Sequence, residues 1–177
     1  MKVAITGASG FLGSHCVANA LKKGYSVRVL VRNTEKTQSA LEMHGIKKDS
    51  VEIVYADLED GHSLDKALEG MDSLLHCAAI FSLSPLDANS MMTVNPSSTK
   101  TLLSSAVKHE LKQTVYVSTM GVFAPITGGD IDKNTPTSTG LGPYTKSKIQ
   151  SEKIARQFQN DGTPVNIVYP GGIFGPI

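Results

Sequence analysis

The feature that most constrains the fold is a glycine-rich stretch, TGASGFLG (6–13), placed between a strand and a helix. The run KVAIT (2–6) before it is apolar and β-branched, and segment 11–24 after it carries an apolar stripe that Gly24 ends. Glycines at GxxGxxG spacing in such a unit let the backbone approach a pyrophosphate, which faces the positive end of the helix. Glycines serving only a tight turn are the alternative, but the flanking strand and helix favour dinucleotide binding. The loop residues expected to contact the dinucleotide are Gly7, Ser9, Gly10, Phe11, Leu12 and Gly13.

Strand-like and helix-like segments alternate along the rest of the chain. Strands are predicted at 25–32, 51–56, 73–79, 114–119 and 165–170, and helices at 34–43, 63–71 (with Ser63 near its N-cap), 97–110 and 144–160. This alternation of apolar strands with helices predicts an α/β fold, a Rossmann-type doubly wound parallel sheet with helices on both faces. The whole chain, 1–177, is expected to form one such domain, interrupted by a long Gly-, Pro- and Thr-rich loop at 120–143.

The composition excludes several classes of protein. Charged residues make up 19% of the chain and the formal net charge is +1, without a Lys/Arg cluster, which argues against binding to nucleic acid or a membrane surface. No apolar run is long enough to span a membrane, and the N-terminus lacks the pattern of a signal peptide. Cys16 and Cys77 form no CxxC, and the histidines show no metal-ligand spacing. The sequence therefore predicts buried, reduced thiols in a cytoplasmic protein, and no metal site.

The residues at the end of the second predicted strand indicate whether the chain prefers NAD(H) or NADP(H). An NAD site places an Asp or Glu there for the ribose 2′-OH, whereas this chain has VLVRN, with Arg32 and no carboxylate. A guanidinium can pair with a 2′-phosphate, so the sequence favours NADP(H) over NAD(H), with a solvated arginine as the alternative. After the third strand, Asp57 and Leu58 are expected near the adenine, where Asp57 would accept from the amino group. A turn or capping aspartate is equally consistent with that position.

Tyr144 and Lys148 form the candidate catalytic pair. A helix starting near Tyr144 puts Lys148 one turn later on the same face, where it could also hold the nicotinamide ribose. The ammonium and the oxidised nicotinamide are expected to lower the pKa of the tyrosine and make it an acid/base near neutral pH. The spacing alone also fits an exposed helix face. Hydroxyls at Ser118 and Thr119 favour a site, because doubly wound sheets bind ligands at the carboxyl ends of their strands.

Further motifs follow along the chain, namely HCAA (76–79), VNPSSTKTLL (94–103) and YPGGIFGP (169–176). Together with TGASGFLG, ADL and YTKSK, they make the sequence resemble an extended short-chain dehydrogenase/reductase, of the branch with NAD(P)-dependent epimerases, dehydratases and dihydroflavonol-reductase-like enzymes. Two positions depart from that family's pattern, because Ser98 replaces a glycine and Tyr169 replaces an arginine.

The resemblance implies roles for individual residues. Thr119, with Ser118 beside it, would bind the substrate oxygen. The loops 80–90 and 120–143 would line the substrate pocket, and helix 144–160 would take part in a possible homodimer. Ala78 and Ala79 are expected to pass close to the cofactor ribose, and the backbone of Pro170, Gly171 and Ile173 is expected to meet the nicotinamide carboxamide.

The expected function is that of an NADP-dependent oxidoreductase. It would transfer hydride between nicotinamide and a small-molecule carbonyl or hydroxyl substrate, with Tyr144 giving or taking the proton. Two alternatives stay open, a nucleotide-sugar epimerase or dehydratase and a non-catalytic NADP-sensing protein. Family members normally continue beyond YPGGIFGP, so a C-terminal substrate-binding part is expected to be largely absent from this chain.

Overall fold

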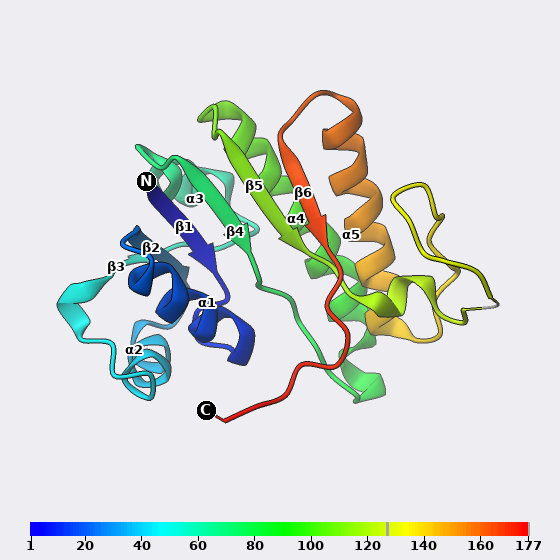
Figure 1. Cartoon of the computed structure of the whole chain (residues 1–177), viewed down its shortest axis with the longest axis horizontal. Helices are drawn as coiled ribbons and strands as arrows, with labels where there is room; N and C mark the ends of the chain where they lie inside the picture. Colours follow the sequence, from blue (N-terminus) through cyan, green and yellow to red (C-terminus); the bar gives the residue numbers. More distant parts are fainter. Residues whose placement is uncertain (127, 177) are drawn as a thin grey trace.

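A computed structural model of the chain describes residues 1–126 and 128–176, and it contains a six-stranded parallel sheet (Figure 1). The strand order is β3-β2-β1-β4-β5-β6, so the direction of winding reverses between β1 and β4. This order confirms the predicted doubly wound fold, and it opens a crevice at the carboxyl ends of the two central strands. The strands are β1 (Lys2–Thr6), β2 (Ser26–Val31), β3 (Glu52–Tyr55), β4 (Ser73–His76), β5 (Gln113–Val117) and β6 (Val165–Val168).

Helices cover both faces of the sheet, because alternate strand residues point to opposite sides. On β1, Val3 and Ile5 pack with α1 and α2, whereas Ala4 packs with α3 and α4. Tyr116 on β5 contacts the cluster that joins α4 to α5. The helices are α1 (Phe11–Lys22), α2 (Thr34–Glu42), α3 (Gly61–Leu68), α4 (Ala88–Lys108) and α5 (Pro143–Asn160), with short 3₁₀ turns η1 (Lys48–Ser50), η2 (Pro85–Asp87) and η3 (Met120–Phe123).

Helix α4 begins earlier than the sequence predicts, at Ala88 rather than at the start of 97–110. Pro96 lies inside the helix, and a proline lacks the N–H of a helical hydrogen bond, which is why the pattern indicated a later start. Tertiary contacts hold the extra turns. The buried Asn95 side chain accepts from Ile80 N at 2.7 Å and donates to Ile80 O at 3.0 Å. The predicted loop 80–90 is therefore partly helical.

The cap of α3 also differs from the prediction. Asp60, not Ser63, is its N-cap, and its carboxylate accepts from the backbone N–H groups of His62 and Ser63. The Ser63 hydroxyl instead donates to the carbonyl oxygens of Asp57 and Asp60. Ser63 therefore steadies the turn after β3, which forms one side of the crevice.

The long connection 120–143 is present as predicted, and its described part folds back on α5. It begins with η3, whose Val122 and Phe123 pack against Ile149 of α5. Farther along, Ser138 N donates to Val122 O at 2.7 Å. The connection therefore lies beside the amino end of α5, where Tyr144 is located.

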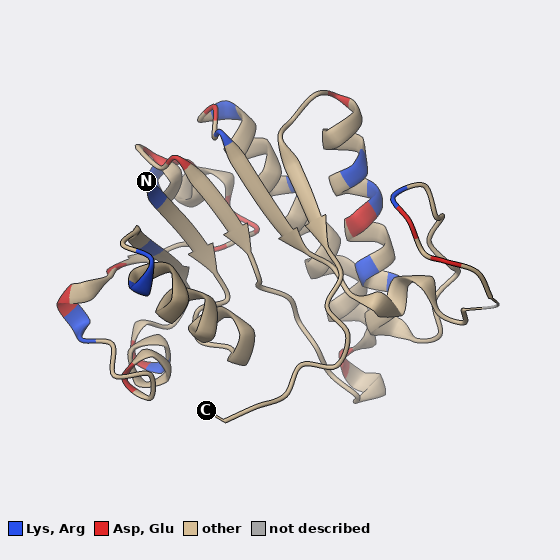
Figure 2. Ribbon diagram, in the orientation of Figure 1, with Lys and Arg blue, Asp and Glu red and all other residues tan. Residues whose placement is uncertain are grey.

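Apart from the buried Lys148 and Glu152 on α5, charged side chains of both signs lie around the periphery, and strands β4, β5 and β6 carry no Lys, Arg, Asp or Glu (Figure 2). None of the helices in the described part of the chain combines the length and apolar character needed to cross a bilayer. Among the same residues, no group of three or more His, Cys, Asp or Glu side chains could hold a metal ion.

Candidate active site

Two glycines of the loop between β1 and α1, Gly7 and Gly13, are packed too closely for any residue with a Cβ. Gly7 has φ +75°, and a Cβ on it would lie 2.8 Å from Ala78 N. A Cβ on Gly13 would lie 2.1 Å from Gly7 O, so α1 approaches the loop backbone directly. Gly10 N donates to Gly7 O at 2.9 Å, which closes the turn. The first turn of α1 therefore directs its N–H groups into the crevice without a competing side-chain cap.

A cleft of about 510 Å³ opens at this loop, within the size range of small-molecule sites. Eight of the predicted cofactor residues line it, and these are Gly7, Ser9, Gly10, Arg32, Asp57, Leu58, Ala78 and Ala79. The structure thus brings the glycine loop together with the ends of β2, β3 and β4. Gly13 does not line the cleft and serves the close approach of α1 instead.

The wall formed by the end of β4 is tied to β1 through buried polar groups. Thr6 Oγ1 lies 2.9 Å from His76 Nδ1 and accepts from Ala78 N at 3.2 Å. Burial, and to a smaller degree the charge of Lys148, lowers the pKa of His76 to about 3, so its ring is neutral. The HCAA motif therefore holds the Ala78–Ala79 wall in place against the glycine loop.

One end of the cleft carries two cations, of which the sequence predicted one. Arg32 is exposed there, and Lys36 lines the same region from the first turn of α2. Asn33 between them caps α2 by accepting from Lys36 N at 2.8 Å. The sequence places Lys36 four residues after Arg32, which could have indicated a second cation at this end of the cleft. That inference requires α2 to begin directly after Asn33, and the residue pattern does not fix this start. Asp57 also lines the cleft. Its Oδ1 accepts from Glu59 N, so Asp57 makes the turn contact that was the alternative to a role in adenine binding.

Cys77 lines the cleft, and both cysteines are partly exposed, which corrects the prediction of buried thiols. The thiols of Cys16, on α1, and Cys77, just after β4, hydrogen-bond each other. That bond lowers the pKa of Cys16 to about 7 and, together with burial, raises the pKa of Cys77. Two residues that are distant in sequence thus form a dithiol beside the glycine loop.

The candidate catalytic pair lies on the first turns of α5. Tyr144 is half-buried, and its ring packs edge-to-face on Phe81 at 4.9 Å between centroids. Phe81 follows Ala79 and Ile80, which line the cleft, so the chain runs directly from the cleft to the tyrosine. Lys148 is buried at 3% exposure, and its Nζ donates to Val117 O at 2.8 Å.

The predicted lowering of the Tyr144 pKa is not found in this structure. Burial raises the pKa of Tyr144 above its usual value. Lys148 directs its ammonium to the end of β5 and over the Tyr116 ring, 4.4 Å from the centroid. Burial also lowers the pKa of Lys148 to about 8. Tyr144 is therefore protonated at neutral pH.

Ser118 and Thr119, which follow β5, differ in their burial and in the hydrogen bonds of their hydroxyl groups. Ser118 is buried and donates to Glu152 Oε2 at 2.7 Å, whereas Thr119 is only partly buried and its hydroxyl accepts from Gly121 N at 3.2 Å. Thr119 thus keeps a hydroxyl proton available to a ligand. Glu152 was not predicted, because a glutamate on a helix gives no sequence sign that it will be buried.

The segment after β6 crosses from β6 toward α1, as Figure 1 shows. Its residues Pro170, Gly171 and Ile173 do not line the cleft, although Pro170 O accepts from Met120 N at 2.9 Å. Farther on, Pro176 O lies 3.1 Å from His15 Nε2 on α1. Two further predicted cofactor residues, Phe11 and Leu12, also lie on α1 outside the cleft lining.

Comparison with known proteins gives matches along the whole chain. A model of the NAD dependent epimerase/dehydratase family matches residues 3–177. The chain is 30% identical over 175 residues to a putative dihydroflavonol 4-reductase from Synechocystis sp., which covers 97% of this chain and 49% of the relative. The chain spans about half the length of the curated relatives it matches.

Solved structures of similar sequence share the fold. The dTDP-glucose 4,6-dehydratase DesIV from Streptomyces venezuelae, solved with NAD bound, superposes with a TM-score of 0.82 at 30% identity, over 94% of this chain and 54% of that chain. The UDP-glucuronic acid 4-epimerase from Bacillus cereus in complex with NAD gives a TM-score of 0.83 at 26% identity, over 99% of this chain and 58% of that chain.

Proposed function

Because the chain belongs to the NAD-dependent epimerase/dehydratase family, we propose that it acts as an NADP-dependent oxidoreductase on a small carbonyl or hydroxyl compound. The observation that carries the proposal is the continuity between the glycine-lined cleft and the Tyr144–Lys148 pair. Both lie at the carboxyl edge of the sheet, and the residues from Ala78 to Phe81 join them.

The cleft fits a dinucleotide by its shape and its donors. Neither Gly7 nor Gly13 leaves room for a Cβ, so the loop offers backbone N–H groups instead of side chains. The amino end of α1 adds the positive end of its dipole and has no acidic residue in its first turn. When bound, the dinucleotide supplies or accepts the hydride that the substrate carbon exchanges.

A preference for NADP(H) over NAD(H) is supported by Arg32 and Lys36. Both cations line one end of the cleft, at the end of β2 where a 2′-OH ligand would need a carboxylate. Charge-assisted contacts to a phosphate are worth about 1.5–3 kcal/mol each, which corresponds to a tenfold or larger preference.

The residues at the edge of the cleft would handle the substrate oxygen and its proton. The raised pKa of Tyr144 keeps its phenol protonated, which is the form needed to donate a proton to a carbonyl oxygen during reduction. Thr119, whose hydroxyl donates to no acceptor among residues 1–126 and 128–176, would donate to the same oxygen and orient it. Lys148 would contribute a positive charge beside the tyrosine and a donor for the ribose.

The test is NADPH oxidation with a panel of ketones and aldehydes. Tyr144→Phe should lose turnover and keep NADPH binding, whereas Tyr25→Phe, at the opposite edge of the sheet, should keep both. Thr119→Ala should cost more activity than Ser118→Ala, because only Thr119 presents its hydroxyl to the substrate side. Full activity in Tyr144→Phe would reject the mechanism, and the reverse ranking of the two hydroxyl variants would reassign the oxygen ligand.

The alternative of a nucleotide-sugar epimerase is supported by the similarity to the Bacillus cereus UDP-glucuronic acid 4-epimerase. An epimerase must retain its cofactor through the cycle, whereas a reductase must exchange it. Chromatography of the nucleotides released on denaturation separates the two: tightly retained NAD(H) would favour the epimerase. A homodimer that involves α5 is also proposed, and light scattering after size exclusion would test it.

A further inference from the structure

Glu152 is a fully buried carboxylate one turn beyond Lys148 on α5. Its Oε2 accepts from Ser118 Oγ at 2.7 Å, and its Oε1 accepts from Arg156 Nε and from Tyr169 Oη, both at 2.9 Å. Burying a carboxylate is costly unless it is paired and hydrogen-bonded, and these three donors meet that requirement. The donors come from three different segments, so Glu152 joins elements that are far apart in sequence.

Lys148 and Glu152 together hold consecutive residues at the end of β5. Lys148 Nζ donates to Val117 O at 2.8 Å, and the next residue, Ser118, donates its hydroxyl to Glu152. Two oppositely charged side chains one helical turn apart on α5 therefore hydrogen-bond to Val117 and Ser118. Thr119 is the next residue in the chain, so its position depends on these two hydrogen bonds.

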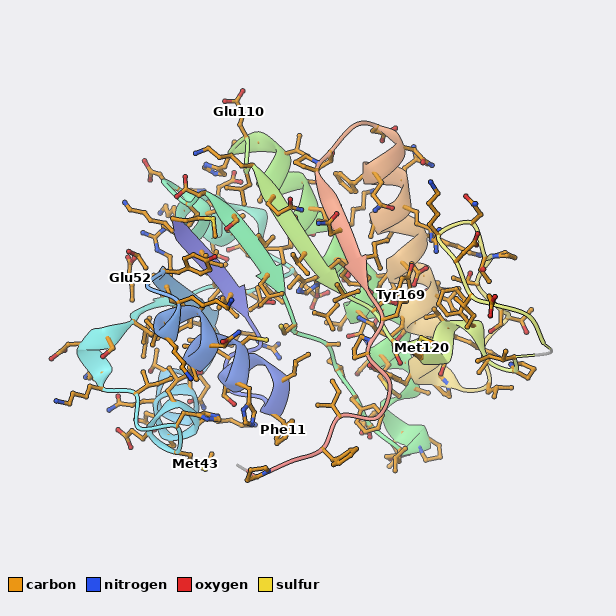
Figure 3. The ribbon with its side chains drawn as sticks, in the orientation of Figure 1. Phe11, Met43, Glu52, Glu110, Met120 and Tyr169 are labelled. Atoms are coloured by element: carbon orange, nitrogen blue, oxygen red, sulfur yellow. The ribbon has the colours of Figure 1, made fainter. Side chains whose placement is uncertain are left out.

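The same cluster extends to both loops beside the site. Arg156 Nη2 donates to Tyr169 Oη at 2.9 Å, and its Nη1 donates to Lys133 O at 3.3 Å, in the connection 120–143. The Tyr169 ring packs on Phe123 with 5.0 Å between centroids. Figure 3 shows Tyr169, which follows β6, close to Met120 at the start of η3. The Glu152 carboxylate and Arg156 therefore connect α5 to the end of β5, to the connection 120–143 and to the segment after β6.

Glu152 also acts on Lys148 electrostatically, because its charge raises the pKa of Lys148 against the effect of burial. Besides Glu152, the titratable groups around Lys148 are Tyr144 on α5, Tyr116 on β5, and His76 and Cys77 at the end of β4. All four are neutral near pH 7, because burial lowers the pKa of His76 and raises that of the two tyrosines, while the hydrogen bond with Cys16, together with burial, raises the pKa of Cys77. The titratable groups around Glu152 itself are Arg156, Tyr169, Lys148 and Tyr116. Two groups raise the pKa of Lys148 against the effect of burial, and Glu152 has a larger influence than Cys77.

We infer that Glu152 is a positioning residue of this site, which fixes the end of β5 through Ser118 and acts on the buried Lys148 amine from one helical turn away on α5. It touches neither cofactor nor substrate, and it acts through Lys148 and through the strand end that carries Thr119. The inference concerns a role within the proposed reaction, so it rests on the proposed function for its kinetic consequence. Its electrostatic consequence can be measured without turnover.

The electrostatic test follows the Cε NMR signal of Lys148 through a pH titration, assigned from its loss in Lys148→Arg. The wild-type midpoint is expected at about 8. Glu152→Gln keeps the shape and removes the charge, so its midpoint should fall by about one pH unit or more. Glu152→Asp keeps the charge and should stay nearer the wild type. Glu110→Gln removes an exposed charge at the opposite edge of the sheet (Figure 3) and should leave the midpoint unchanged.

An unchanged midpoint in Glu152→Gln, or an equal fall in Glu110→Gln, would overturn the inference. If Glu152→Gln does not fold, Ser118→Ala tests the other half, because it breaks the bond to the strand end and keeps the charge. Ser118→Ala should lower kcat about tenfold or more through misplacement of Thr119, with an unchanged Lys148 midpoint and unchanged NADPH affinity. Wild-type kcat in Ser118→Ala would overturn the positioning role. A wild type without any turnover would reject the proposed function, and the NMR result would then decide on Glu152 by itself.

Discussion

The close approach of α1 to the backbone of Gly7 provides a graded test of the glycine loop. A Cβ on Gly13 would lie 2.1 Å from Gly7 O and 2.5 Å from Gly7 C, a Cβ on Gly10 would lie 3.3 Å from Gly7 O, and one on Gly61 would lie 3.6 Å from a Thr101 methyl group. All three glycines stand in or next to the first turn of a helix. Substitution by alanine therefore adds the same atom, a Cβ, at three positions that differ in the distance to the nearest neighbouring atom.

The separations predict the order and size of the effects. Gly13→Ala forces α1 away from backbone atoms that cannot rotate aside, and overpacking of this kind costs about 3 kcal/mol or more. For a chain of this length that lowers Tm by about 6–12 °C. Gly10→Ala meets one tight contact and should cost about 1 kcal/mol. Gly61→Ala meets ordinary contact in a helix and should be neutral or stabilising by up to about 1 kcal/mol.

Urea unfolding followed by circular dichroism measures stability, and NADPH fluorescence titration measures binding. Gly13→Ala should lose NADPH affinity beyond its loss of stability, because moving α1 withdraws the N–H groups that face the cleft. Gly61→Ala should bind as the wild type does. Equal stability and equal NADPH affinity in Gly13→Ala and Gly61→Ala would refute the close approach of α1 to the loop.

Three further predictions use other parts of the molecule. Arg32→Asp should lower the ratio of NADPH to NADH affinity about ten- to hundredfold, measured by competitive titration, and Lys36→Asp should lower it in the same direction; an unchanged ratio in both would reject the 2′-phosphate site. In the folded protein the pKa of Lys148 is lowered to about 8, so Lys148 loses its proton between pH 8 and 10, whereas in the unfolded chain it stays protonated. The free energy of unfolding should therefore rise by about 2 kcal/mol over this range relative to Lys148→Met. Parallel pH dependences of the two proteins in urea unfolding would contradict this. Iodoacetamide at neutral pH should alkylate Cys16 before Cys77, because the pKa of Cys16 is lowered to about 7 while that of Cys77 is raised; peptide mass spectrometry showing the opposite order would disprove the thiol contact.

The parts predicted correctly depend on local rules. The strand before Gly7 and the helix after Gly13 follow from residue pattern, and the glycine spacing follows from steric limits that apply within a few residues. Alternating strands and helices of these lengths leave few arrangements other than a parallel sheet with covered faces. The sequence alone therefore predicted the fold, and it also predicted much of the cleft lining, because the ends of parallel strands meet at one edge.

The errors arise where distant residues override local preference. Pro96 indicates a helix start, but the bonds of Asn95 to Ile80 carry α4 through it. Pairing of Lys148 with Tyr144 indicates a lowered tyrosine pKa, but burial raises that pKa instead. Burial is a property of the assembled layers, so no short motif reports it.

The sequence by itself determined the architecture, the glycine loop and the identity of the Tyr144–Lys148 pair, because each is encoded in short-range spacing. Only the tertiary structure decided which groups those residues face. It put Lys36 beside Arg32 at the cleft, and it made Glu152 a buried acceptor for Ser118 rather than an exposed helix residue. Hydrogen bonding and desolvation depend on distances between segments, and folding sets those distances.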